Sequence, residues 1–170
     1  GKIVKSLRIS GRAQNSFING DIDEAIVKFE RVLKDFPGTF GANQSLLYLL
    51  KQSIISNDLI NIEKLLFNEN LEINDPFIQS SIHRIRSDYF YNKSNYSEAL
   101  NESEFAMNSS SLETIINLNQ IDLVNILISD NKYSEAEKIL NNLISNEDIT
   151  FNEKNYVEQM IGFIKHKMSI

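Results

Sequence analysis

The sequence predicts an all-α protein, an α-solenoid of about four helix-turn-helix repeats with a period of 37 residues and a C-terminal capping helix. A short segment recurs four times at an interval of 37 residues, and fixed self-similarity of this length is typical of stacked repeats. Gly and Pro total only eight among 170 residues, which leaves few turns for a many-stranded sheet. Apolar residues are spaced by three or four, as in amphipathic helices.

The recurring segment has the composition of a corner between two helices. Its four copies are Gly20–Ala25, Asn57–Ile62, Ser94–Ala99 and Asn131–Ala136. Each begins with a small or turn-tolerant residue, which suits the left-handed backbone that often ends a helix. A bulky apolar residue follows two positions later and can pack into the corner. Three copies end in Ala, which lets paired helices approach closely, and the second copy is the degenerate one.

Polar residues inside these corners are expected to cap the second helix of each pair. Asp23, Ser97 and Ser134 stand where an N-cap is wanted, and the Glu that follows each of them complements the positive helix end. Capping also accounts for the acidic group at Asp21, Asp23 and Glu24, so we do not assign acid–base chemistry to it.

The apolar spacing predicts nine helices, and the length and hydrophobic content predict one domain over residues 1–170. The predicted helices lie near 3–19, 22–36, 40–56, 59–69, 76–93, 96–108, 111–130, 133–146 and 152–168. The segment 112–128 is apolar nearly all round and should lie between neighbouring helices. Val157, Ile161, Ile164 and Met168 share one face of the last helix, as in a capping helix. The repeats would cover about 6–39, 42–75, 79–112 and 116–149, with the capping helix at 152–168.

Composition argues against several classes of function. The net charge of −6 and the pI near 5.0 disfavour a nucleic-acid binder. The chain has no Cys, and His83 and His166 show no ligand spacing, so we expect no metal. It has no Gly-rich phosphate loop and no nucleophile elbow, so we expect neither a cofactor nor an enzyme. No apolar run is long enough to span a membrane.

The first unit resembles the tetratricopeptide repeat. The residues that carry the resemblance are Ala13, Gly20, Asp21, Asp23, Glu24, Ala25, Phe29, Leu33 and Pro37, at the motif's small, turn, aromatic and terminating positions. The resemblance covers roughly 6–146. It departs from the family in its period, 37 rather than 34 residues, and in lacking the early Trp and, in later units, the second Gly. It implies a right-handed solenoid that binds proteins in a concave groove.

The family's groove positions, carried onto this sequence, give a mixed surface suited to an extended or helical peptide. The site residues are Gln14, Phe17, Ile18, Leu47, Lys51, Ile54, Arg84, Asp88, Tyr91, Asn92, Asn125 and Ile128, with Ser10, Ile55, Ile121 and Ser129 at further groove positions. No unit has the Lys and Asn with which some members clamp a peptide's terminal carboxylate. The alternative is that the apolar members pack within the chain or against a second copy.

A narrower resemblance concerns the compartment of the chain. The segment Phe36–Tyr48 is similar to a link common in bacterial envelope proteins with these repeats, such as the membrane-anchored ancillary subunit of the Sec translocon. It implies an anchor before Gly1 and a periplasmic location; a cytoplasmic location is the alternative. Lys2, Lys5, Arg8 and Arg12 form a basic stripe, either a solvated face or a contact with an anionic membrane or partner.

The leading functional prediction is an adaptor or scaffold that binds a protein or peptide partner. The alternatives are a self-assembling scaffold, a membrane-tethered subunit that assists protein export or assembly, and a docking subunit for an enzyme encoded elsewhere.

Overall fold

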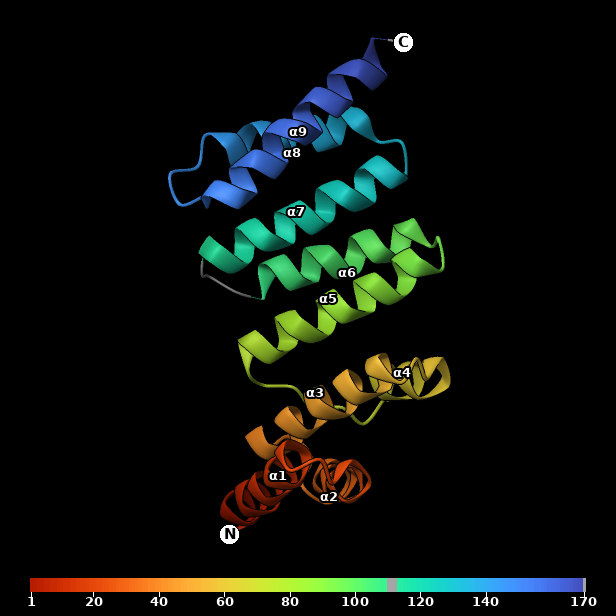
Figure 1. The fold of residues 1–170 in the computed structure, drawn as a ribbon, viewed down its shortest axis with the longest axis vertical. Coiled ribbons are helices and arrows are strands. Elements are labelled where there is room, and N and C mark those ends of the chain that lie inside the picture. Colours follow the sequence, from red (N-terminus) through yellow and green to blue (C-terminus); the bar gives the residue numbers. More distant parts are fainter. Residues whose placement is uncertain (110–112, 170) are drawn as a thin grey trace. The chain divides into compact units, whose positions relative to one another are not determined.

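All regular secondary structure in the described residues is helical, so the all-α prediction is confirmed (Figure 1). The computed structural model describes residues 1–109 and 113–169, with side chains described from residue 116 onward in the second range. In these ranges the helices are α1 (Lys2–Ile18), α2 (Ile22–Asp35), α3 (Phe40–Ile55), α4 (Leu59–Leu66), α5 (Pro76–Asn92), α6 (Tyr96–Asn108), α7 (Glu113–Ser129), α8 (Tyr133–Ile144) and α9 (Phe151–Met168).

Most helix boundaries agree with the predicted ones to within one or two residues. The start predicted at residue 111 lies outside the described residues. The clearest difference is α4, which ends at Leu66 and not at 69. Beyond it, the Asn68 side-chain oxygen accepts a hydrogen bond from the Asn70 N–H at 2.9 Å. Such a local side-chain bond competes with helical hydrogen bonding, and the chain leaves α4 as a non-helical segment that reaches α5.

The chain divides into two compact units, and each is described separately. Unit 1 is Gly1–Ile82 and unit 2 is His83–Ile170. Helices that follow one another in sequence pack together in unit 1, from α1 to α4, and α3 also packs on α1. In unit 2 the same holds from α6 to α9.

Four helix-to-helix corners share one backbone geometry. Gly20, Asn57, Ser94 and Asn131 have φ values of 86°, 55°, 58° and 58°, which confirms the left-handed backbone expected there. At the third corner the Ser94 N–H donates to the Tyr91 carbonyl and the Asn95 N–H to the Phe90 carbonyl, both at 2.9 Å. The other three corners have the equivalent pair of bonds. This Schellman arrangement satisfies carbonyls that a helix end leaves open.

The N-cap prediction for Asp23, Ser97 and Ser134 is wrong, because the helices begin earlier. The N-cap residues are Asp21, Asp58, Asn95 and Lys132. Each follows the left-handed residue directly. Its N–H therefore closes the preceding helix, while its carbonyl accepts the first bond of the next one, as Asn95 does from the Ala99 N–H at 3.1 Å. The side chains of Asp58 and Asn95 also accept cap hydrogen bonds.

The core of unit 1 is built around the small residues of its first corner. Ala13, Ala25, Phe29 and Leu49 form one buried cluster. The Phe29 ring is stacked on the Tyr48 ring with centroids 4.8 Å apart. Ala25 is fully buried, and its small side chain lets α2 approach α1 closely, as the sequence predicts.

The core of unit 2 joins α7, α8 and α9. The buried cluster comprises Leu123, Val124, Leu127, Ala136, Leu140, Leu143, Val157 and Ile164. α7 therefore lies against neighbouring helices, as its apolar composition predicts. On α9, Val157 and Ile164 are buried and Ile161 packs beside them, whereas Met168 in the last turn is 49% exposed and does not join the core.

Candidate functional site

Polar contacts within unit 2 link side chains of three helices on one face. Arg84 on α5 donates from Nε to Asp122 Oδ2 on α7 at 2.9 Å. The Tyr91 and Ser129 hydroxyls, again on α5 and α7, are 2.7 Å apart. The Tyr156 hydroxyl on α9 donates to the Asn125 side-chain oxygen on α7. We call this surface the α5–α7–α9 face; its residues are Arg84, Asp88, Tyr91, Asp122, Asn125, Ser129 and Tyr156.

Helical spacing explains why these side chains meet. Arg84, Asp88 and Tyr91 lie at i, i+4 and i+7 on α5, and therefore share one side of that helix. Asp122, Asn125 and Ser129 occupy i, i+3 and i+7 on α7. The row of side chains on α5 and the row on α7 have nearly the same spacing, so residues of one row can meet residues of the other at both ends. The contacts of Arg84 with Asp122 and of Tyr91 with Ser129 accordingly both join residues 38 apart in sequence.

The electrostatics of this face centre on two carboxylates and one guanidinium. Partial burial raises the pKa of Asp88, the Asp122 carboxylate adds to the rise, and Arg84 opposes it. Asp88 still reaches solvent, so the surrounding atoms remove only part of its hydration. Burial is also the main cause of the raised pKa of Tyr156. Tyr156 therefore stays a neutral hydrogen-bond donor at physiological pH.

The face can bind a polar partner. The side chains of Arg84 and Asp122 are 34% and 30% exposed, so both are ordered by their contact and still accessible. A guanidinium carries five N–H donors, and in the described part of the chain only the Nε donor of Arg84 is used. Its two terminal amino groups are available to a carbonyl or carboxylate. Arg and Tyr are the side chains that most often dominate binding at protein interfaces.

The structure brings together four of the predicted site residues of unit 2, namely Arg84, Asp88, Tyr91 and Asn125. Asn92 is exposed at the end of α5. Ile128, like Ile121, packs against the core of unit 2 and so belongs partly to the interior.

Asp122 and Tyr156 were missed by the sequence analysis. Asp122 stands three residues before Asn125, and this helical spacing could have found it. Tyr156 follows the last repeated corner, so the repeat register gave no signal for it.

In unit 1 the predicted residues have contacts of a different kind. Gln14 donates from Nε2 to Gln44 Oε1 at 3.2 Å, which joins α1 to α3, and Phe17 meets Tyr48 edge-on with centroids 5.5 Å apart. Leu47 is half-buried, whereas Ile18, Lys51, Ile54 and Ile55 are exposed. Ser10 is buried, and its hydroxyl donates to the Leu7 carbonyl at 3.2 Å. Ser10 is thus unable to meet a partner, contrary to its predicted groove position.

The other chemically capable groups have structural contacts. His83 Nδ1 lies 2.6 Å from Glu102 Oε2, and its ring stacks on Phe105. Within residues 1–109 and 113–169, no three His, Cys, Asp or Glu side chains are grouped so that they could hold a metal ion. In the same ranges, no helix combines the length and the apolar character needed to cross a membrane.

Replacing Asp88 by Asn is expected to stabilise the protein at neutral pH. A raised pKa means that the folded state binds the Asp88 proton more tightly than the unfolded state does. Protonated Asp88 therefore stabilises the fold at pH values below the ordinary pKa of 3.8, and this contribution is lost as pH rises through the pKa of the folded state. Asp88→Asn removes that loss. Because solvent still reaches the group and screens its charge, we expect a gain of less than about 1 kcal/mol. Thermal unfolding should show a higher Tm at pH 7 and a shrinking difference towards pH 4.

The matched control for this test is Asp148→Asn, which alters an exposed carboxylate in the turn between α8 and α9. An Asp88→Asn protein that is less stable than the parent at pH 7 would show that the attraction of Arg84 outweighs burial and the repulsion of Asp122.

Comparison with known proteins assigns no family. No protein-family model matches the chain, and no curated protein matches its sequence.

Proposed function

We propose that this chain is a tetratricopeptide-type α-solenoid that binds a protein partner through the α5–α7–α9 face. The observation that carries the proposal is the fixed arrangement of half-exposed Arg84, Tyr91 and Tyr156 on three different helices. Mutual hydrogen bonds hold these side chains in place before a partner arrives. Such preorganisation reduces the entropy lost on binding.

The repeated corners support the solenoid part of the proposal. Their left-handed residues, from Gly20 to Asn131, are 37 residues apart, and all four have the same pair of closing hydrogen bonds. Consecutive helices pack on one another within each unit. A chain of this kind exposes one helix of each pair along an extended surface, and solenoids use that surface for binding.

The chemistry of the face indicates an extended peptide or a partner helix with groups of both signs. The terminal amino groups of Arg84 suit a carbonyl or carboxylate of the partner. Asp88 and Asp122 suit an N–H donor or a cation. The hydroxyls and the amide of the face can pair with either group of a peptide bond. With two carboxylates and one guanidinium, the face does not suit the phosphates of nucleic acid.

Crosslinking from position 91 tests the proposed function. A photoreactive phenylalanine derivative at Tyr91 is expected to capture one dominant partner from an extract of the source cell. Adding Arg84→Gln should reduce that capture at least tenfold, about 1.4 kcal/mol, because the change removes the charged donor. We choose Gln because Glu would place a third carboxylate beside Asp88 and Asp122 and perturb the fold itself.

The control substitution is Lys138→Gln, which removes an exposed cation from α8 and should leave capture unchanged. Circular dichroism should show the same helicity in every variant. If capture is equally strong with Arg84→Gln, the α5–α7–α9 face is not the partner-binding surface.

Self-assembly is the second candidate function, favoured by exposed apolar side chains on α1. Ile3, Val4 and Leu7 are 65%, 58% and 44% exposed, and a second copy could cover them. Light scattering over a range of concentrations separates the two functions, since a monomer at high concentration argues against a self-assembling scaffold. Crosslinks from position 91 that join only copies of this chain would favour it.

A further inference from the structure

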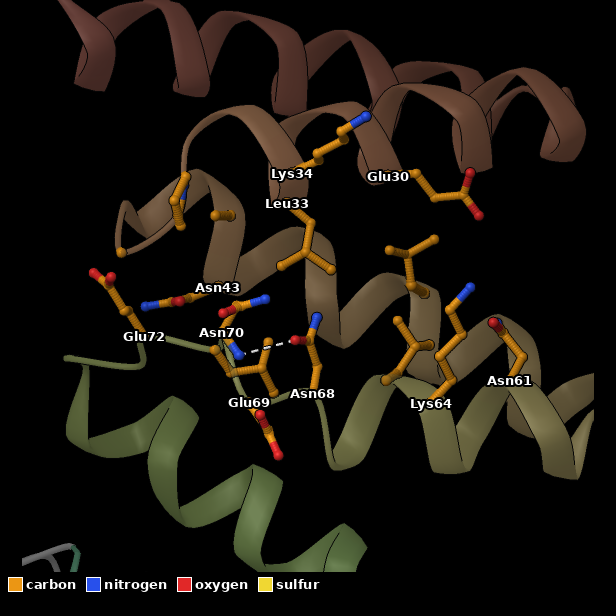
Figure 2. Close-up of a pocket in the computed structure, with 16 residues that line it drawn as sticks. Glu30, Leu33, Lys34, Asn43, Asn61, Lys64, Asn68, Glu69, Asn70 and Glu72 are labelled. Carbon is orange, nitrogen blue, oxygen red and sulfur yellow. Dashed lines mark hydrogen bonds between the residues drawn. The ribbon is translucent and has the colours of Figure 1, made fainter.

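Unit 1 contains a hollow bounded by α2, α3, α4 and the segment 68–72 beyond α4 (Figure 2). Its volume is about 780 Å³, within the range of about 300–1,000 Å³ that ligand sites occupy. Of the two helices α2 and α4 that border it, α2 has 14 residues and α4 only 8. The chain beyond Leu66 leaves the helix and borders an open space.

The hollow has apolar side chains and a polar rim. Leu33, Leu49, Leu65 and Leu71 line it from α2, α3, α4 and the following segment. Figure 2 shows Glu30 and Lys34 projecting from α2, and Asn61 and Lys64 from α4. Such a combination can take up an apolar side chain and hydrogen-bond the polar groups attached to it.

Asn43 is the feature of this wall that points to a ligand. It is only 4% exposed, yet it lines the hollow. Its backbone N–H bonds to the Thr39 carbonyl, but its side-chain amide has no hydrogen-bond partner among the described residues. Its amide is not among the buried side-chain amides that lack a partner, so it is open to the hollow. A ligand there could hydrogen-bond to it in place of water.

Further carboxamides surround the same space. The side-chain nitrogen of Asn61 is already in use, since Nδ2 donates to Ser53 Oγ at 2.7 Å. Asn68 uses its side-chain oxygen to accept from the Asn70 N–H, which leaves the Asn70 side chain for other contacts. Each carboxamide both donates and accepts hydrogen bonds. It therefore complements a peptide bond, which carries one donor and one acceptor.

Charge and composition disfavour other ligand classes. The rim has two cations, Lys34 and Lys64, and three carboxylates, Glu30, Glu69 and Glu72, a net charge of −1. This balance does not suit a phosphate group, which proteins bind with clustered positive charge. None of the described residues that line the hollow is aromatic, so a nucleobase or sugar ring would find no stacking partner among them. A neutral peptide segment fits both features.

We propose that this hollow binds an extended peptide segment. One apolar side chain of the ligand lies among the four leucines, and its flanking peptide groups bond to the side chains of Asn43 and Asn70. All of these residues belong to unit 1, so the site is separate from the α5–α7–α9 face and goes beyond the proposed function.

Selection from a library of random linear peptides displayed on phage tests the proposal. The whole chain is the target, with counter-selection against Asn70→Trp, which fills the mouth of the hollow from an exposed position. The affinities of the selected peptides are then measured by titration calorimetry. We expect Asn43→Leu and Asn70→Trp each to weaken binding at least tenfold, and Asn142→Trp, at an exposed position on α8, to leave it unchanged.

Each outcome decides the question. If no peptide prefers the parent chain over Asn70→Trp, or if the selected peptides bind both variants as well as the parent, the hollow is not a peptide site. If Asn43→Leu lowers the helicity, the affinity of the selected peptides for Asn70→Trp alone decides whether the hollow binds peptides. Arg84→Gln should not change these affinities. The crosslinking result at Tyr91 and the peptide result can therefore fail independently.

Discussion

Phe29→Ala is expected to lower the free energy of unfolding by about 3–5 kcal/mol. Phe29 is only 1% exposed and belongs to the buried cluster of Ala13, Ala25 and Leu49. Its ring also stacks on Tyr48 at 4.8 Å. Truncation removes the buried ring and leaves a cavity among helices that cannot close around it completely. We expect no other single side-chain truncation in unit 1 to cost more.

Urea unfolding followed by circular dichroism measures this loss. The matched control is Phe151→Ala, because Phe151 is 77% exposed at the start of α9. Its truncation should change stability by less than about 0.5 kcal/mol. Similar losses for the two variants would mean that the burial of Phe29 contributes little to unit 1.

Gly41→Ala is expected to destabilise the protein by about 1–3 kcal/mol, although Ala is the better helix former. Gly41 is buried where α3 packs on α1. A Cβ atom there would lie 3.1 Å from the carbonyl carbon and oxygen of Ser6 and would also overlap the Ser6 hydroxyl. That hydroxyl is itself hydrogen-bonded to Thr39 at 2.7 Å. The added methyl group must therefore push the two helices apart or break this bond.

Gly11→Ala is the matched control, because it makes the same chemical change inside α1. Nothing lies within 4 Å of a Cβ atom at Gly11. Helix propensity then acts alone, and we expect a gain of about 0.5–1 kcal/mol. The two variants should shift Tm in opposite directions. An increase for both would show that α1 and α3 do not approach closely at Gly41.

The sequence by itself determined the helices and their corners. Apolar spacing predicted the helix positions, and the residue types at Gly20, Asn57, Ser94 and Asn131 predicted a left-handed backbone. These properties are local, because helix periodicity and φ preference depend on a residue and its near neighbours. The N-cap prediction failed because one residue closes one helix and opens the next, and residue types did not reveal this double role.

The candidate site could be predicted only in part. The spacing of Arg84, Asp88 and Tyr91 places them on one side of a helix from sequence alone. The pairing of Arg84 with Asp122 joins residues 38 apart and depends on how α7 packs on α5. The contact of Tyr156 with Asn125 depends in the same way on α9. Neither pairing has a signal in local sequence.

The hollow beside Asn43 was decided by the tertiary structure. The prediction carried α4 on to residue 69, and a helix of that length would have left a different surface. Because α4 ends at Leu66, the segment 68–72 is not helical and lines a space with α2 and α3. Helix positions follow from local preferences, whereas a cavity and its unpaired amide arise only where separate elements meet.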